Sequence, residues 1–132
     1  MKASQKLQHL FLLSLALVYV HGLEEILTGF QYKDSHIAFG AKMLGTSPEL
    51  FYWVTHIIFW LLLPIIYFIF RNSKYGLVLA GVFGIIFIEE FHHLIKGAQS
   101  LQYSPGVFTA LFYPILGIFF WKQWLRDWRS KT

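Results

Sequence analysis

Residues 50–70, LFYWVTHIIFWLLLPIIYFIF, form an apolar stretch without a charged side chain. At about 1.5 Å per residue, an α-helix of this length crosses the roughly 30 Å hydrocarbon core of a bilayer. Of the 132 residues, 56% are hydrophobic and only 14% are charged, whereas soluble domains have about 25% charged residues. The sequence therefore predicts an integral membrane protein with one domain, residues 1–132.

Three further stretches are long and apolar enough to span a membrane: residues 7–30, 75–95 and 106–124. The fold class expected is all-α, a bundle of four transmembrane helices. The second and fourth spans are each preceded by Ser-Pro, Ser47-Pro48 and Ser104-Pro105, which is typical of an N-cap followed by the first helical residue. Residues 35–44 predict a short interfacial helix between the first two spans.

The distribution of Lys and Arg predicts the orientation of the spans, because cytoplasmic flanks carry the cationic excess. Of the eleven cations, those expected on the cytoplasmic side are Lys2, Lys6, Arg71, Lys74, Lys122, Arg126, Arg129 and Lys131. Both termini are therefore expected to be cytoplasmic, in a multi-pass protein of the cell (inner) membrane. This asymmetry also accounts for the net charge of +4, so nucleic acid is not an expected partner.

The N-terminal stretch has a second interpretation, as a secretory signal cleaved near Gly22. Cleavage would remove His21 and leave three spans with termini on opposite sides. The uncleaved chain obeys the charge rule and is the favoured interpretation.

Two polar clusters interrupt the apolar stretches, HGLEE at residues 21–25 and EEFHH at residues 89–93. Ionisable groups within a span cost a few kcal/mol each and indicate a functional site by default. Helical rise places both clusters about 21 Å from the inner ends of their helices, level with His56 and Tyr113 on the other two spans. The sequence thus predicts one polar layer in the outer leaflet. Its predicted metal ligands are His21, Glu24, Glu25, His56, Glu89, Glu90, His92 and His93.

A divalent metal explains this layer best, because crowded carboxylates need cations and only Lys96 is near. Glu oxygen and His nitrogen together suit iron, manganese or zinc. Four-helix bundles hold two-metal sites through Glu-x-x-His steps, and residues 89–92 and 90–93 match that step. We therefore expect one or two metal ions. A metal-free proton-transfer cluster and a purely structural cluster remain open alternatives. His9 and His36 lack comparable surroundings and are not expected to be ligands.

The motif His21-x-x-Glu24-Glu25 at the end of a first span, followed by further histidines, resembles the HXXEE-domain family of small prokaryotic membrane proteins. That family has no established activity. The resemblance supports these three residues as part of a site and implies nothing about a substrate.

The function expected is that of a membrane-embedded metalloenzyme acting on a lipid or another hydrophobic small molecule that enters from the outer leaflet. Iron or manganese would support oxidation or hydroxylation, and zinc would support hydrolysis. Glu25 or Glu90 is the expected general base, and Tyr113 or Thr109 would orient the substrate or a ligand. The alternatives are a metal-free Glu/His proton-transfer isomerase and a non-catalytic subunit that handles metal ions or protons, completed by an oligomer or a larger complex.

Overall fold

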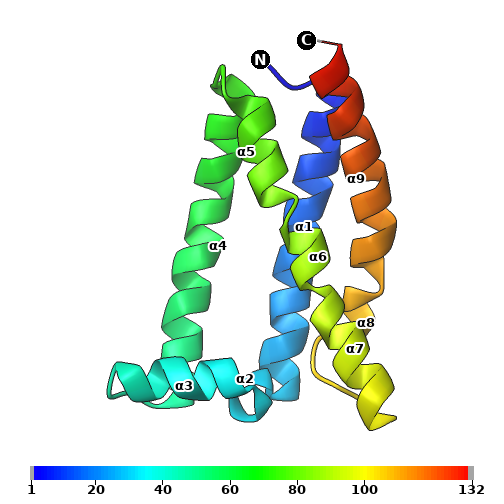
Figure 1. The fold of residues 1–132 in the computed structure, drawn as a ribbon. Helices are drawn as coiled ribbons and strands as arrows, with labels where there is room; N and C mark the ends of the chain where they lie inside the picture. Colours follow the sequence, from blue (N-terminus) through cyan, green and yellow to red (C-terminus); the bar gives the residue numbers. More distant parts are fainter. Residues whose placement is uncertain (1, 131–132) are drawn as a thin grey trace.

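The computed structural model describes residues 2–130, and this part of the chain is helical, without strands. Lys131, one of the predicted cytoplasmic cations, lies outside the described residues. The helices, labelled in Figure 1, are α1 Gln5–Thr28, α2 Phe30–Lys33, α3 Ser35–Met43, α4 Pro48–Asn72, α5 Gly76–Phe83, α6 Ile86–Glu89, α7 Phe91–Ser100, α8 Val107–Ala110 and α9 Phe112–Arg129.

Three helical segments are long and apolar enough to cross a membrane: Gln5–Thr28, Pro48–Asn72 and Gly76–Ser100, the last of which comprises α5 to α7. They overlap the first three predicted spans. The fourth predicted span, residues 106–124, is helical but divided between α8 and α9. Helix α9 carries Lys122, Arg126, Asp127 and Arg129, and this charge sets it apart from the other three segments.

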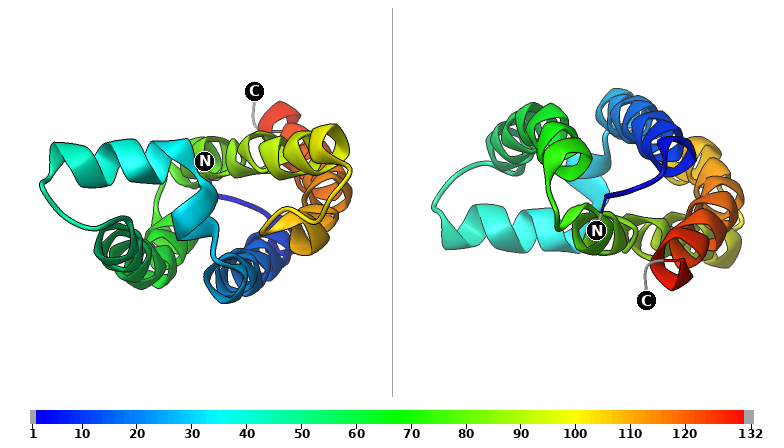
Figure 2. Two further views of the ribbon diagram at one scale, coloured as in Figure 1. Left: turned by 90° about the horizontal axis from the view of Figure 1, so that it is seen from below. Right: turned by 90° about the horizontal axis from the view of Figure 1, so that it is seen from above.

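The long helices run side by side, and α2 and α3 lie across one end of them (Figure 1). Both termini lie at the opposite end, which we call the termini end; the other is the α3 end. The view from below in Figure 2 shows α2 and α3 crossing that end. Helix α1 packs against α4 and α9, and α3 packs against α4. The short helix predicted at residues 35–44 is therefore present as α3.

The two Ser-Pro steps have different roles. At Ser47 the hydroxyl accepts a hydrogen bond from the Leu50 backbone N–H at 3.1 Å, and Pro48 is the first residue of α4, which confirms the predicted helix start. The prediction for Ser104-Pro105 is wrong, because α8 begins only at Val107. Gly106 has a positive φ of 83° and turns the chain after the proline, so these residues form a loop instead of a cap.

The third segment is also less regular than the single helix predicted for residues 75–95. It is interrupted after Phe83 and again at Glu90. Around both points the backbone forms i→i+3 hydrogen bonds, Phe87 N–H to Gly84 C=O at 3.2 Å and His93 N–H to Glu90 C=O at 3.3 Å. Such tight turns within a helix often mark functional positions. The second turn places Glu90 at the junction of α6 and α7.

The termini half of the molecule is held by aromatic packing. The Phe11 ring stacks between those of Phe70 and Phe83, with centroid distances of 4.4 and 4.1 Å. Gly84 lets α9 approach α5, since a Cβ there would lie 2.7 Å from the Trp121 ring. This packing fixes the long helices relative to one another and so positions the residues at the α3 end.

Candidate metal centre

Four side chains at the α3 end bring their ligand atoms into a closed ring, which we call the His/Glu ring. His21 Nε2 lies 2.9 Å from Glu90 Oε2, which lies 3.4 Å from His93 Nε2. Glu25 Oε1 closes the ring, 3.1 Å from His93 Nε2 and 3.7 Å from His21 Nε2. The side chains are at most 16% exposed. The ring thus joins α1, which carries His21 and Glu25, to the α6–α7 junction and α7.

The spacing of this ring suits a metal ion. Ligands about 2.0–2.2 Å from a tetrahedral metal lie roughly 3.3–3.6 Å from one another. His21, Glu25 and His93 form a group able to hold an ion, as do Glu90, His92 and His93. His21 Nε2 and Glu90 Oε2 are buried and make no hydrogen bond, although they lie only 2.9 Å apart. Two carboxylates would also balance the charge of a divalent cation, so the residues fit such an ion.

The histidines present Nε2 to the cluster because their Nδ1 atoms are engaged elsewhere. His93 Nδ1 lies 2.7 Å from the Pro105 carbonyl oxygen, and His56 Nδ1 lies 3.2 Å from that of Tyr52. A carbonyl only accepts, so we assign the proton to Nδ1, which leaves a lone pair on Nε2 in the neutral ring. Metal-binding histidines are commonly oriented in this way.

Glu24 has a separate role from its neighbour Glu25. Its carboxylate accepts hydrogen bonds from the Thr109 backbone N–H at 2.8 Å and hydroxyl at 2.5 Å. It also accepts from the Phe108 N–H at 3.1 Å and the Tyr103 hydroxyl at 2.8 Å. Since the Thr109 hydroxyl donates to Glu24, it accepts from His21 Nδ1, 2.6 Å away. Glu24 therefore orients His21 through Thr109.

Helix α4 supplies the other contacts of Glu25. The Tyr52 hydroxyl donates to Glu25 Oε2 at 2.7 Å, and His56 Nε2 lies 3.5 Å from the same oxygen. The Tyr52 and His56 rings are stacked, with centroids 3.8 Å apart. Glu25 thus faces α7 with one oxygen and α4 with the other.

The loop before α8 covers the ring at Gly106. A Cβ on this residue would lie 2.8 Å from His21 Cε1 and 2.9 Å from the His93 ring. Gly106 also has a positive φ, which glycine adopts readily. Glycine is therefore needed here for both backbone conformation and space.

Some predicted site residues lie outside the ring. Glu89 is exposed. Among the described residues, the two groups able to hold an ion include neither Glu89 nor Glu24. Successive residues on a helix point about 100° apart, so one member of each Glu-Glu pair faces the ring while its neighbour turns away. His56 lies beside the ring, and His92 is half-buried in the second group.

Tyr113, predicted to orient a substrate, is buried with its ring edge against His21 at a centroid distance of 5.2 Å. Its hydroxyl has no hydrogen-bond partner among the described residues. His9 and His36 are exposed. Tyr52 and Gly106 contact ring residues but are not among the predicted site residues. A signal existed for Tyr52, because it lies four residues before His56 and so shares its helix face.

A cavity of about 350 Å³ adjoins the ring. Its walls include Glu25, Glu90 and His93 and the apolar side chains of Phe30, Ile37 and Phe59. Thr55 of α4 and Glu89 of α6 also line the cavity, and both residues are exposed. The cavity therefore opens on the side of the molecule between these two helices.

The fold and the ring define a helical protein with candidate membrane spans and a buried His/Glu group able to hold a metal ion. Residues 12–120 match the family described as "Protein of unknown function with HXXEE motif", and the chain belongs to this family. This confirms the resemblance seen at His21, Glu24 and Glu25. Neither the curated proteins nor the solved structures include a match to the chain.

Proposed function

We propose that the protein is a membrane-embedded metalloenzyme whose His/Glu ring holds a divalent metal ion and which acts on a lipophilic substrate. The observation that carries this proposal is the closed ring of four buried ligand atoms, 2.9 to 3.7 Å apart. The ring contains no Lys or Arg, so a metal is the simplest means of neutralising its two carboxylates.

In the proposed arrangement the chain spans the membrane four times as a single domain, with α8 and α9 as the fourth span and both termini cytoplasmic. The termini lie at one end of the molecule, which supports this topology (Figure 1). The ring then lies in the outer leaflet. The side opening of its cavity between α4 and α6 supports entry of the substrate from the bilayer.

The metal would be iron, manganese or zinc, since two imidazoles and two carboxylates suit each of these ions. Iron or manganese would supply oxidation or hydroxylation chemistry, and zinc would supply hydrolysis. His21, Glu25, Glu90 and His93 would hold the ion. Tyr52 steadies Glu25, and the unpartnered hydroxyl of Tyr113 is available to orient a substrate beside His21.

Elemental analysis of the detergent-purified protein tests the proposal. We expect about one equivalent of metal per chain, lost from Glu25→Gln and retained by Glu89→Gln, a matched change at an exposed carboxylate beside the cavity. Metal content below about 0.2 equivalents in the wild type, without uptake on reconstitution, would refute the proposal.

A metal-free proton-transfer isomerase is the second candidate, and one observation favours it. A chain of short contacts leads from Glu90 through His21 and Thr109 to Glu24 and the exposed Tyr103, at 2.9, 2.6, 2.5 and 2.8 Å. Such a chain is suited to moving a proton between the ring and the surface. Absence of metal from a folded protein would favour this candidate over the first.

A further inference from the structure

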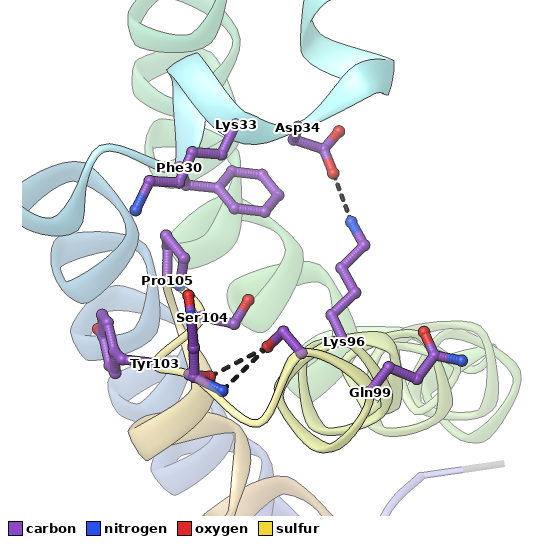
Figure 3. A pocket seen from close by; sticks show the side chains of 10 residues that line it. Phe30, Lys33, Asp34, Lys96, Gln99, Tyr103, Ser104 and Pro105 are labelled. Carbon is purple, nitrogen blue, oxygen red and sulfur yellow. Dashed lines mark hydrogen bonds and ion pairs between the residues drawn. The ribbon is translucent and has the colours of Figure 1, made fainter.

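A second cavity, of about 530 Å³, lies at the α3 end (Figure 3). Eight of its ten lining residues are polar, Lys33, Asp34, Lys96 and Ser104 among them, and we call it the polar cavity. Figure 3 shows Lys96 reaching from α7 towards Asp34, with Phe30 and Pro105 on the opposite wall. This cavity therefore suits a polar group.

The polar cavity adjoins the candidate metal centre. The Phe30 side chain lines both cavities, and its ring centroid lies 5.2 Å from that of His93. Pro105 lines the polar cavity while its carbonyl oxygen accepts the hydrogen bond from His93 Nδ1. The two cavities thus meet at Phe30.

The charges of the polar cavity favour an anion. Lys96 Nζ donates to Asp34 Oδ2 at 2.7 Å, and an ammonium group has three N–H donors, so further donors remain for a ligand. Lys33 is a second cationic residue of the lining. Asp34 is the single carboxylate among the lining residues, and Lys96 already neutralises it. Two cations against one anion leave the lining net positive.

Asp34 is held in place independently of any ligand. Its Oδ1 accepts hydrogen bonds from the backbone N–H groups of His36 and Ile37, at 2.8 and 3.3 Å, as the N-cap of α3. Burial alone would raise the pKa of Asp34, but Lys96 and these N–H groups outweigh it and hold the pKa below its usual range. Asp34 is therefore ionised at neutral pH and keeps the Lys96 ammonium at the cavity.

We propose that this cavity binds the anionic headgroup, a carboxylate or a phosphate, of an amphiphile whose adjoining carbons reach the His/Glu ring. The proposal rests on the proposed function, because it names the substrate class of the same centre. Lys96 follows His93 by three residues, a rise of about 4.5 Å along α7. The reacting carbon is therefore close to the headgroup, and the remaining chain extends into the bilayer between α4 and α6.

Binding of three probes to the purified full-length protein in phosphatidylcholine nanodiscs tests the headgroup site: palmitate, hexadecyl phosphate and uncharged methyl palmitate. We expect at least one anionic probe to bind at least about tenfold more tightly than the ester, as expected for a hydrogen bond between charged groups. The two anionic probes distinguish a carboxylate from a phosphate headgroup. Equal affinity for all three, or no binding, would overturn the proposal.

Lysine variants locate the site. Lys33→Gln and Lys96→Gln should each weaken the preferred anionic probe about tenfold and leave the ester unchanged, whereas Lys42→Gln, an exposed lysine of α3 outside the cavity, should change neither. Lys33→Gln decides the matter if Lys96→Gln does not fold, because Lys96 also pairs with Asp34. Unchanged affinity in the folded lysine variants would place the headgroup elsewhere.

The position of the reacting carbon is tested with the Mn²⁺-loaded protein and palmitate labelled with ¹³C. Paramagnetic broadening should be stronger at the carbon beside the carboxylate than at the terminal methyl. The reverse order would overturn the placement. Metal content is measured on the same samples, and the probe affinities are also measured on metal-free protein. Failure of the headgroup site is thereby distinguished from failure of the metal proposal.

Discussion

The two halves of the molecule are held together by different forces. At the termini end, Phe11, Phe70 and Phe83 stack with other apolar side chains, and the contacts are numerous and nondirectional. At the α3 end, His21 and Glu25 belong to a network of short, directional polar contacts. The first half therefore supplies stability and the second forms the candidate site, so substitutions should affect stability and metal affinity separately.

The largest expected effect is on stability. Phe11→Ala removes a fully buried ring that stacks with two others, and we expect a loss of about 3 kcal/mol in the free energy of unfolding. Reversible denaturation in detergent measures it. The metal affinity of the molecules that remain folded should be unchanged. Phe119→Ala, at a ring that is 58% exposed, is the matched control and should cost much less. Equal losses would contradict the division between the halves.

The next largest effect is expected on metal affinity, and a comparison of two glycine variants separates backbone strain from contact with the ring. Gly106 and Gly45 both have positive φ, 83° and 62°, where an L-residue costs about 1–2 kcal/mol. A Cβ at Gly45 would meet no atom within 4 Å, whereas at Gly106 it would meet both histidine rings. Both Ala variants should lose stability through backbone strain, and Gly106→Ala should lose more because its Cβ also clashes with the two rings. Only Gly106→Ala should lose metal affinity, about a hundredfold, in a chelator competition. Retained affinity would mean that the loop does not fix the histidines.

A smaller effect is expected where the polar network acts on the ring from outside. Thr109→Val keeps the shape of the side chain but removes the hydroxyl between His21 Nδ1 and Glu24. We expect metal affinity to fall about tenfold. In the Thr109→Val protein, Glu24→Gln should lower metal affinity less than it does in the wild type, because both changes break the same network. Thr55→Val serves as control, since that hydroxyl bonds to carbonyls of its own helix. Additive losses would show that Glu24 acts without Thr109.

The smallest effect concerns the ion pair across the polar cavity. The pKa of Asp34 is lowered in the folded protein, so its carboxylate stabilises the fold above the unfolded value of about 3.9. This stabilisation is lost as the pH falls through the folded pKa. Asp34→Asn should therefore lower the free energy of unfolding by about 1 kcal/mol at pH 7. This difference between the wild type and the variant should shrink as the pH falls below about 4. A difference in the free energy of unfolding that stays constant down to about pH 3 would contradict a stabilising role of the ionised Asp34.

Much of the helical architecture could be predicted from the sequence, because apolar length is a local property. The segments Gln5–Thr28, Pro48–Asn72 and Gly76–Ser100 overlap three predicted spans. The interruptions at Gly84 and Glu90 could not be predicted, since they depend on what packs against them. Gly84 is approached by Trp121 of α9, a contact that no local pattern reveals. The Ser-Pro step at Ser104 was misinterpreted for a similar reason, because Gly106 turns the chain there against two distant histidines.

The sequence alone was enough to predict helices long and apolar enough to span a membrane and the level at which His21, His56 and His93 meet, because apolar length and helical rise depend only on order along the chain. Which carboxylate of each Glu-Glu pair faces the ring could be told only from the folded chain. Glu25 and Glu90 lie there, while Glu24 is held by the backbone of α8 and Glu89 is exposed. The rotation of a helix about its own axis is set by packing against its neighbours, and adjacent residues differ by about 100°.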